Sequence, residues 1–177
     1  LDQQLNLVIA IDTSTSDQTL AAYQEAAKTL IEQLGPNDNA AVISFAEEVV
    51  TLKDVTGDYE ELSAAIDSIK LKGYLTSLNE TIMIAVELLA TRTQGRKVAL
   101  ILADFDNNIG DIPTVDVITR ALEVNVPVHI TGVEPKVQPG EFIELSQLTG
   151  GESIVAASFK TIGAEVDRLA VDHILRQ

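Results

Sequence analysis

The sequence predicts an α/β fold: a doubly wound, Rossmann-like three-layer sandwich in which helices flank a mostly parallel six-stranded sheet. Three observations carry this prediction. Short apolar runs alternate along the chain with amphipathic segments of helical spacing. Two of these runs, LNLVIAI at 5–11 and KVALILA at 97–103, are so continuously hydrophobic that both faces of each strand must be covered. One pair of short strands is joined too tightly for a helix to intervene, which predicts one antiparallel edge strand.

Local composition predicts the first four elements. The run 5–11 is rich in branched residues and is typical of a central strand. Apolar side chains spaced three or four apart then predict a helix over 17–34, which Gly35-Pro36 ends. The segments 40–45 and 48–53 are the two strands of the tight antiparallel pair.

Three helices and one strand occupy the middle of the chain. Apolar spacing predicts helices over 58–69 and 78–91. The run 97–103 is the second strongly buried strand. A further helix is predicted over 113–124, with Pro113 in its first turn, where the missing N–H of proline costs nothing.

The last third of the chain continues the alternation. A strand over 126–133 precedes a short helix over 141–148, and an edge strand over 152–156 leads into a closing helix over 159–175. No internal repeat or linker-like run interrupts the pattern, so we expect one domain over residues 1–177. Because the first residue is leucine rather than methionine, we expect the chain to be a mature or excised piece of a longer protein.

Charge and composition exclude several classes of function. The chain has 177 residues, of which 12 are basic and 27 acidic, and its net charge is −15. This acidic surplus argues against a nucleic-acid binder and against docking on an anionic membrane surface, since both need basic side chains. The absence of cysteine excludes disulfides, thiolate metal sites and a cysteine nucleophile. No apolar run approaches the roughly 20 residues that span a bilayer.

Oxygen-bearing side chains follow the two most buried strands. With the common strand order 3-2-1-4-5-6, the first and fourth strands are neighbours, and ligands of such sheets bind at their carboxyl ends. Asp12 and Asp104 lie at these two ends, while Ser14, Ser16 and Thr76 offer hydroxyls. Alternate residues of an extended turn point the same way, so Asp12, Ser14 and Ser16 can converge. Mg²⁺ prefers oxygen ligands of these kinds.

The motifs of this candidate site resemble those of a known family. Asp-x-Ser-x-Ser at 12–16, a threonine at 76 after a glycine-containing loop and an aspartate at 104 after a buried strand are similar to the metal-ion-dependent adhesion site of von Willebrand factor type A domains. The similarity extends over nearly the whole chain, through PNDNAAVISFAEEV, TSLNETIMIAVELL, RKVALILAD and LSQLTGGE. The resemblance implies that Ser14, Ser16 and Thr76 bind Mg²⁺ or Mn²⁺ directly. It also implies that Asp12 and Asp104 act through water or hydrogen bonds.

Two residues depart from the family pattern. Ala103 and Phe105 flank Asp104, where the family usually has threonine and glycine. Ala103 supplies no hydroxyl to the site, and a side chain at 105 restricts the backbone of the loop. We expect Phe105 to pack beneath the loop, with an exposed contact for a partner as the alternative. Asp106 and Asp111 either rim the metal face or belong to a solvated acidic loop.

The resemblance implies a non-enzymatic domain for adhesion or complex assembly, in which an Asp or Glu carboxylate of a protein ligand completes the coordination of the metal. We expect it outside the cell, at the cell surface or in a membrane-associated complex.

Several alternatives stay open. One is a scaffold domain whose metal site is degraded by Ala103 and Phe105. Another is a phosphate-handling enzyme of actin-like fold, which IAIDTST at 9–15 resembles, although that fold needs a second hairpin strand after this turn and glycine-rich phosphate loops. Ser16 has an ordinary alternative as a helix cap. His129 and His173 are expected to be structural or surface residues.

Overall fold

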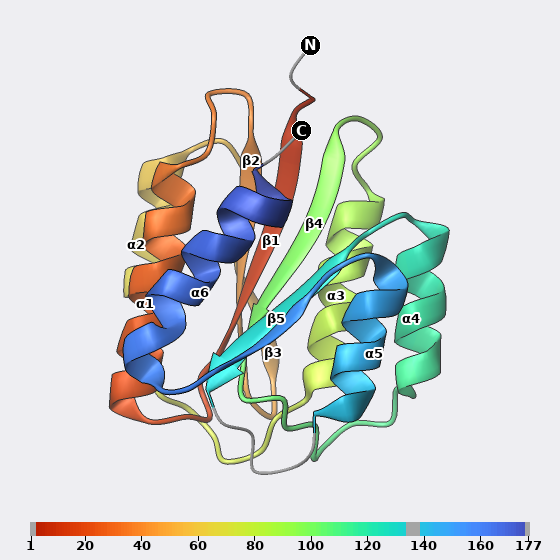
Figure 1. Ribbon diagram of the computed structural model, residues 1–177. Helices are drawn as coiled ribbons and strands as arrows, with labels where there is room; N and C mark the ends of the chain where they lie inside the picture. Colours follow the sequence, from red (N-terminus) through yellow and green to blue (C-terminus); the bar gives the residue numbers. More distant parts are fainter. Residues whose placement is uncertain (1–2, 134–138, 176–177) are drawn as a thin grey trace.

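The protein is described here by a computed structural model, which covers residues 3–133 and 139–175 and contains a six-stranded sheet in the order β3-β2-β1-β4-β5-β6 (Figure 1). All neighbouring strands run parallel except β2 and β3, which are antiparallel. The predicted strand order and the single antiparallel edge strand are therefore confirmed. The strands are β1 (Leu5–Asp12), β2 (Asn39–Phe45), β3 (Val49–Thr56), β4 (Arg96–Leu102), β5 (Val128–Val133) and β6 (Ser153–Ala156).

Within the described residues, six α-helices cover the two faces of the sheet. Helices α1, α2 and α6 lie on one face, and α3, α4 and α5 on the other (Figure 1). Their bounds are α1 (Asp17–Glu32), α2 (Tyr59–Asp67), α3 (Leu78–Ala90), α4 (Thr114–Glu123), α5 (Gly140–Thr149) and α6 (Ile162–Leu169). None of the helices in this part of the chain has the length and hydrophobicity needed to cross a membrane. Because α1 follows β1 directly, the second hairpin strand of the actin-like alternative is not formed, and that fold is wrong.

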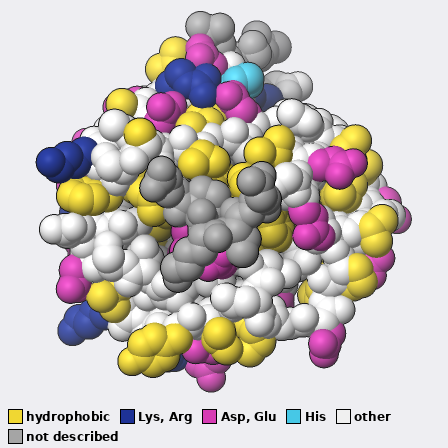
Figure 2. Space-filling model, turned by 60° about the horizontal axis from the view of Figure 1, so that its bottom comes forward, with side chains coloured by type: hydrophobic (Ala, Val, Ile, Leu, Met, Phe, Trp, Pro, Cys, Tyr) yellow, Lys and Arg dark blue, Asp and Glu magenta, His cyan; other side chains and the backbone are white. Residues whose placement is uncertain are grey.

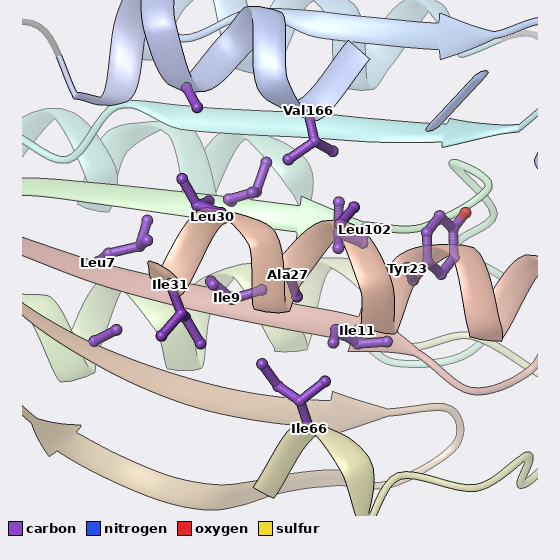
Figure 3. Packing of buried hydrophobic residues seen from close by; sticks show 14 of the residues in the cluster. Leu7, Ile9, Ile11, Tyr23, Ala27, Leu30, Ile31, Ile66, Leu102 and Val166 are labelled. Atoms are coloured by element: carbon purple, nitrogen blue, oxygen red, sulfur yellow. The ribbon is translucent and has the colours of Figure 1, made fainter. Parts of the chain in front are cut away.

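The side chains of β1 divide between two hydrophobic cores. Leu7, Ile9 and Ile11 point to the face covered by α1 and α6 (Figure 3). Val8 and Ala10 belong to the core beneath α3, α4 and α5. All five side chains are fully buried, and each of the larger ones contributes roughly 1.5–3 kcal/mol to stability. Packing on both faces therefore holds β1 firmly beneath the residues that follow it.

Several boundaries differ from the prediction: β3 ends at Thr56 rather than at residue 53, most others shift by one or two residues, and three differences have a physical reason. The closing segment is not one helix: a 3-10 turn, η1 (Phe159–Thr161), precedes α6, and a π-helical turn, η2 (Ala170–Ile174), follows it. The wider turn forms because the N–H of Leu175 donates to the carbonyl of Ala170 at 2.7 Å. Pro113 has extended backbone angles and stands at the N-cap of α4 rather than inside its first turn. β5 begins after Pro127, since proline has no N–H to donate to the sheet.

The register of the central strands brings the predicted site residues to one edge. Ile11 of β1 pairs with Leu102 of β4, so Asp12 and Asp104 leave the sheet side by side. β5 approaches the same turn closely: a Cβ on Gly132 would lie 1.5 Å from the carbonyl oxygen of Ala103. Glycine at this position therefore allows β5 to support the loop after β4.

Candidate metal centre

Asp12, Ser14 and Thr76 are linked by hydrogen bonds at the carboxyl end of β1. Asp12 is fully buried, and its Oδ1 accepts from the N–H of Ser14 at 2.8 Å and from Ser14 Oγ at 2.6 Å. Ser14 Oγ lies 2.8 Å from Thr76 Oγ1, although the two residues are 62 positions apart in the chain. Three of the five residues predicted for the site therefore lie in one hydrogen-bonded group.

The loop before α3 is tied to the ends of β1 and β2. The N–H of Lys72 donates to the carbonyl of Thr13 at 3.0 Å. Ser77 donates to the carbonyl of Ala46 from its N–H at 3.0 Å and from its Oγ at 2.7 Å. Thr13 in turn donates to the carbonyl of Phe45 from both its N–H and its hydroxyl. These hydrogen bonds, made on both sides of Thr76, hold the hydroxyl of Thr76 over the turn that follows β1.

Two asparagines, to which the sequence analysis assigned no role, complete this framework. The N–H of Thr76 donates to Asn108 Oδ1 at 2.7 Å, and the N–H of Asn108 donates to the carbonyl of Thr76 at 3.0 Å. Asn107 Oδ1 accepts from the N–H of Asn79, in the first turn of α3, at 3.1 Å. Asparagine is common in loops because its side chain bonds to backbone groups. This general tendency is the only feature of the sequence that indicates a role for the two asparagines, because the residues to which they bond lie about thirty positions away in the chain.

The electrostatics of this edge of the sheet are set by buried carboxyl groups that lie close together. Burial is the main reason that the pKa of Asp12 is raised to about 6, while the hydrogen bonds from Ser14 oppose the shift. The negative charges of Asp104 and Asp106 raise the pKa of Asp12 further. Asp12 Oδ2 is buried and has no hydrogen-bond partner among the described residues. An unpaired buried carboxylate oxygen is costly, so a proton or a cation at this point would stabilise the site.

The loop after β4 turns Phe105 inward. Phe105 has a φ of 68°, and its side chain is fully buried in the core beneath α3, α4 and α5. The expected packing role is confirmed, and the alternative of an exposed aromatic contact is wrong. Asp104 and Asp106, on either side, are also buried, and the N–H of Asp106 donates to Asp104 Oδ1 at 3.3 Å. Asp106 is therefore buried next to Asp104, whereas Asp111 is exposed.

Ser16 serves a helix in this structure. Its Oγ donates to Thr19 Oγ1 at 2.9 Å and accepts from the N–H of Thr19 at 3.1 Å, which makes it the N-cap of α1. Among the described hydrogen bonds, none joins Ser16 to Asp12, Ser14 or Thr76. The structure therefore shows the ordinary capping role for this residue.

Ser16→Ala is expected to lower the free energy of unfolding by about 1 kcal/mol, because it removes the side-chain cap of α1. Ser16→Asp supplies a capping carboxylate and should stay close to the wild type. Chemical denaturation of both variants in chelator measures the difference. A neutral Ser16→Ala variant that binds metal less tightly would show instead that this hydroxyl serves the ion.

Hydroxyl oxygens would have to contribute to any ion binding here. Over residues 3–133 and 139–175, no three His, Asp or Glu side chains are grouped as a metal centre built from such ligands alone. A carboxylate beside two hydroxyls is nevertheless a donor set that suits a hard divalent cation. A cavity of about 370 Å³ opens next to Ser14 and is bounded on its other side by the 71–74 loop. Figure 2 views the molecule from this end, where hydrophobic side chains are scattered among acidic and uncharged ones.

Comparison with known proteins bears on the fold of the chain as a whole. The family model for the von Willebrand factor type A domain matches residues 6–167. "Uncharacterized protein YfbK" of Escherichia coli K12 is 37% identical over 73 residues. The matched stretch is 38% of this chain and only 13% of that protein, so most of YfbK has no counterpart here.

Two solved structures share the fold at low sequence identity. A von Willebrand factor type A structure from Catenulispora acidiphila has a TM-score of 0.82 at 18% identity, over 95% of this chain and 42% of its own. Proximal thread matrix protein 1 from the mussel byssus, in a structure with a zinc-occupied MIDAS motif, has a TM-score of 0.78 at 15% identity, over 96% and 48%. At such identities the likeness shows the fold alone. Since the family model spans nearly all of the sequence, this chain belongs to the von Willebrand factor type A domain family.

Proposed function

We propose that this domain binds a protein partner through a divalent cation, Mg²⁺ or Mn²⁺, held at the carboxyl end of β1. An Asp or Glu carboxylate of the partner would complete the coordination. The observation that carries this proposal is the contact of Ser14 Oγ with Thr76 Oγ1 beside the buried Asp12. Two findings support it: domains of this family commonly take part in protein interactions or adhesion, and the mussel protein has zinc in its MIDAS motif.

The hydrogen bonds of the site direct its hydroxyl oxygens. Ser14 gives its single hydroxyl proton to Asp12 Oδ1, so the proton in the Ser14–Thr76 bond comes from Thr76. Ser14 Oγ accepts this proton with one of its two lone pairs, so its other lone pair and those of Thr76 Oγ1 are left available. Ser14 and Thr76 would hold the ion through these oxygens, with Asp12, Asp104 and Asp106 acting through water or hydrogen bonds. Once bound, the ion supplies a coordination position for a carboxylate oxygen.

Charge favours a bridging cation over direct contact with an acidic partner. The chain carries a net charge of −15, and Asp12, Asp104 and Asp106 lie buried at the site itself. A partner carboxylate would be repelled by these groups in the absence of a cation. Because the two hydroxyl ligands are neutral, the ion keeps much of its positive charge for the partner.

We propose binding rather than catalysis at this site. The chain contains no cysteine, and its two histidines line a cavity at the amino end of β4, away from the proposed metal site at the carboxyl end of β1. The nucleophile–histidine pairs of covalent catalysis therefore have no counterpart beside Thr76.

Exposed apolar side chains next to the site support a protein as the partner. Tyr74 is 94% exposed, and Leu71, Leu75 and Ile109 are each more than one third exposed. Leu71 and Tyr74 line the cavity beside Ser14. Apolar groups on a rim of this kind mark surfaces that bind other proteins. A partner segment with apolar residues beside its acidic one would cover them.

Titration calorimetry with Mg²⁺ and Mn²⁺ tests the proposal. Thr76→Ala should weaken the affinity for metal by about tenfold or more, because it removes a hydroxyl ligand. Thr76→Ser keeps the hydroxyl and should bind nearly as well as the wild type. Equally weak binding by all three proteins would overturn the proposal. A wild type that binds neither ion and melts at the same temperature with and without chelator would identify the scaffold alternative instead.

A further inference from the structure

A second cavity, of about 350 Å³, lies at the opposite edge of the sheet from the metal site. Its lining residues come from the amino ends of β4 and β5 and from η2. The amino end of β4 lies near the top of Figure 1. The residues that line it come from five separate segments: Gln3, Gly95, Arg96, Lys97, Val98, Val124, Asn125, Pro127, His129, Gly150 and His173. A volume of this size suits a small ligand.

The charge of the lining is the reverse of that of the whole chain. Acidic residues outnumber basic ones 27 to 12, yet no Asp or Glu lines this cavity. Arg96 and Lys97 contribute two cations, and both histidines of the chain lie here, with their ring centroids 5.7 Å apart. The surroundings of the cavity therefore favour an anion.

The acidic groups nearest to the histidines are already engaged. Glu152 Oε1 lies 2.9 Å from Arg168 Nη2, and Glu152 Oε2 lies 2.9 Å from His173 Nε2. Asp172 Oδ2 is 4.0 Å from Arg168 Nη1. Arg168 thus neutralises much of the negative charge next to His173. Arg96 and Lys97, the two cations that line the cavity, therefore remain available to a ligand.

Several donors of the lining have capacity to spare. Arg96 donates from Nη2 to the carbonyl of Ile174, while its Nε has no partner among the described residues. Within the described part of the chain, Lys97 Nζ has a single long contact, 3.4 Å, to the carbonyl of Val124. His129 Nδ1 accepts from the N–H of Glu152 at 3.1 Å, so the ring proton is on Nε2. Burial lowers the pKa of His129 to about 4, so that ring is a neutral donor at pH 7.

We propose that this cavity binds a small dianionic oxyanion, which Arg96 and Lys97 neutralise and to which His129 donates a hydrogen bond. Two cations match two negative charges, and the donors approach from β4 and β5, with His173 beside them, which suits a compact oxyanion. A polyanion such as nucleic acid is disfavoured, because it would extend over the acidic surface beyond the cavity. A small ion instead feels mainly the groups within the screening distance of about 8 Å.

Histidine NMR gives a direct test, because the only two histidines of the chain both line the cavity. Tag-free protein in chelator is titrated with inorganic phosphate, with malonate as the dicarboxylate arm and with sodium chloride at matched ionic strength. We expect saturable shifts of both imidazole signals with phosphate or malonate, and none with chloride. The tighter of the two oxyanions identifies the preferred ligand class. Linear or absent shifts with both would overturn the proposal.

Charge variants separate the site from a general salt effect. Lys97→Gln should weaken the affinity for the oxyanion about tenfold, since one of the two charges is lost. Lys160→Gln removes an exposed lysine that does not line the cavity and should leave the affinity unchanged. Equal loss in both variants would overturn the proposal. Thr76→Ala should bind the oxyanion normally, so failure of this site and failure of the metal site are distinguishable.

Discussion

Asp12→Asn is expected to stabilise the metal-free protein relative to the wild type as pH rises, while weakening its affinity for Mg²⁺ by about 10- to 100-fold. The two effects share one cause. Asp12 is buried with one carboxylate oxygen unpaired, near the charges of Asp104 and Asp106. The negative charge of Asp12 therefore destabilises the fold in the absence of metal, and a bound cation would remove this effect. Asparagine keeps the shape of the side chain and removes the charge.

The sign of the pH effect follows from the raised pKa. The pKa of Asp12 is about 6 in the folded protein, against 3.8 for an unperturbed carboxyl group. Between these values the folded state holds a proton that the unfolded state has released, so stability falls as pH rises. The ionisation of Asp12 costs about 3 kcal/mol in total at pH 7.5, of which about 1.5 kcal/mol is incurred above pH 5. The difference in unfolding free energy between variant and wild type should grow by that smaller amount over pH 5–7.5.

Urea denaturation in chelator at several pH values measures this difference, and titration calorimetry measures the metal affinity. Asp111→Asn is the matched control, because it removes one exposed charge from the loop after β4, which also carries Asp104 and Asp106, and should show neither effect. A constant gap between Asp12→Asn and the wild type across this pH range would contradict the prediction. In the wild type, protons and metal compete for the site, so the affinity for Mg²⁺ should fall as pH drops through about 6.

The sequence predicts the framework of the site better than its details. Continuous apolar runs in β1 and β4 identify buried neighbouring strands, and the position of Asp12 and Asp104 follows from the rule for open sheets. Thr76 is recognisable in the sequence as a donor of a hydroxyl oxygen, but its direct role at the metal is implied only by the family resemblance. Its place depends on loop hydrogen bonds, such as those from Lys72 and Ser77, that no periodic pattern reveals.

Two details of the site could not be predicted because they depend on tertiary contacts. Asn108 pairs with a residue 32 positions away, and its sequence neighbourhood is that of any polar loop. Asp106 is buried, and Phe105, the residue before it, enters the core with a left-handed backbone. A non-glycine residue rarely adopts that conformation, so local propensity gave no reason to expect it. Asp106 and Asp111 thus looked alike in the sequence, although only the first is buried.

Phe105→Ala is expected to destabilise the protein by about 3–5 kcal/mol, because it leaves a large cavity in a fully packed core. The φ of 68° adds a second expectation. Alanine in this conformation remains strained, whereas glycine adopts it freely, so Phe105→Gly should be about 1 kcal/mol more stable than Phe105→Ala although it has fewer atoms. Both variants should bind Mg²⁺ more weakly, since the buried ring anchors the loop that carries Asp104 and Asp106.

Phe142 provides the matched control, since it is buried in the same core but lies in the helix α5. There the order of the two substitutions should reverse, because glycine within a helix is about 1 kcal/mol less favourable than alanine. Denaturant unfolding of the four variants gives both orders in one experiment. If glycine is the less stable replacement at 105 as well, the positive φ does not govern the energy of this loop. Opposite orders at 105 and 142 would show that burial of the Phe105 ring compensates for an unfavourable backbone conformation. That conformation belongs to the loop that carries Asp104 and Asp106.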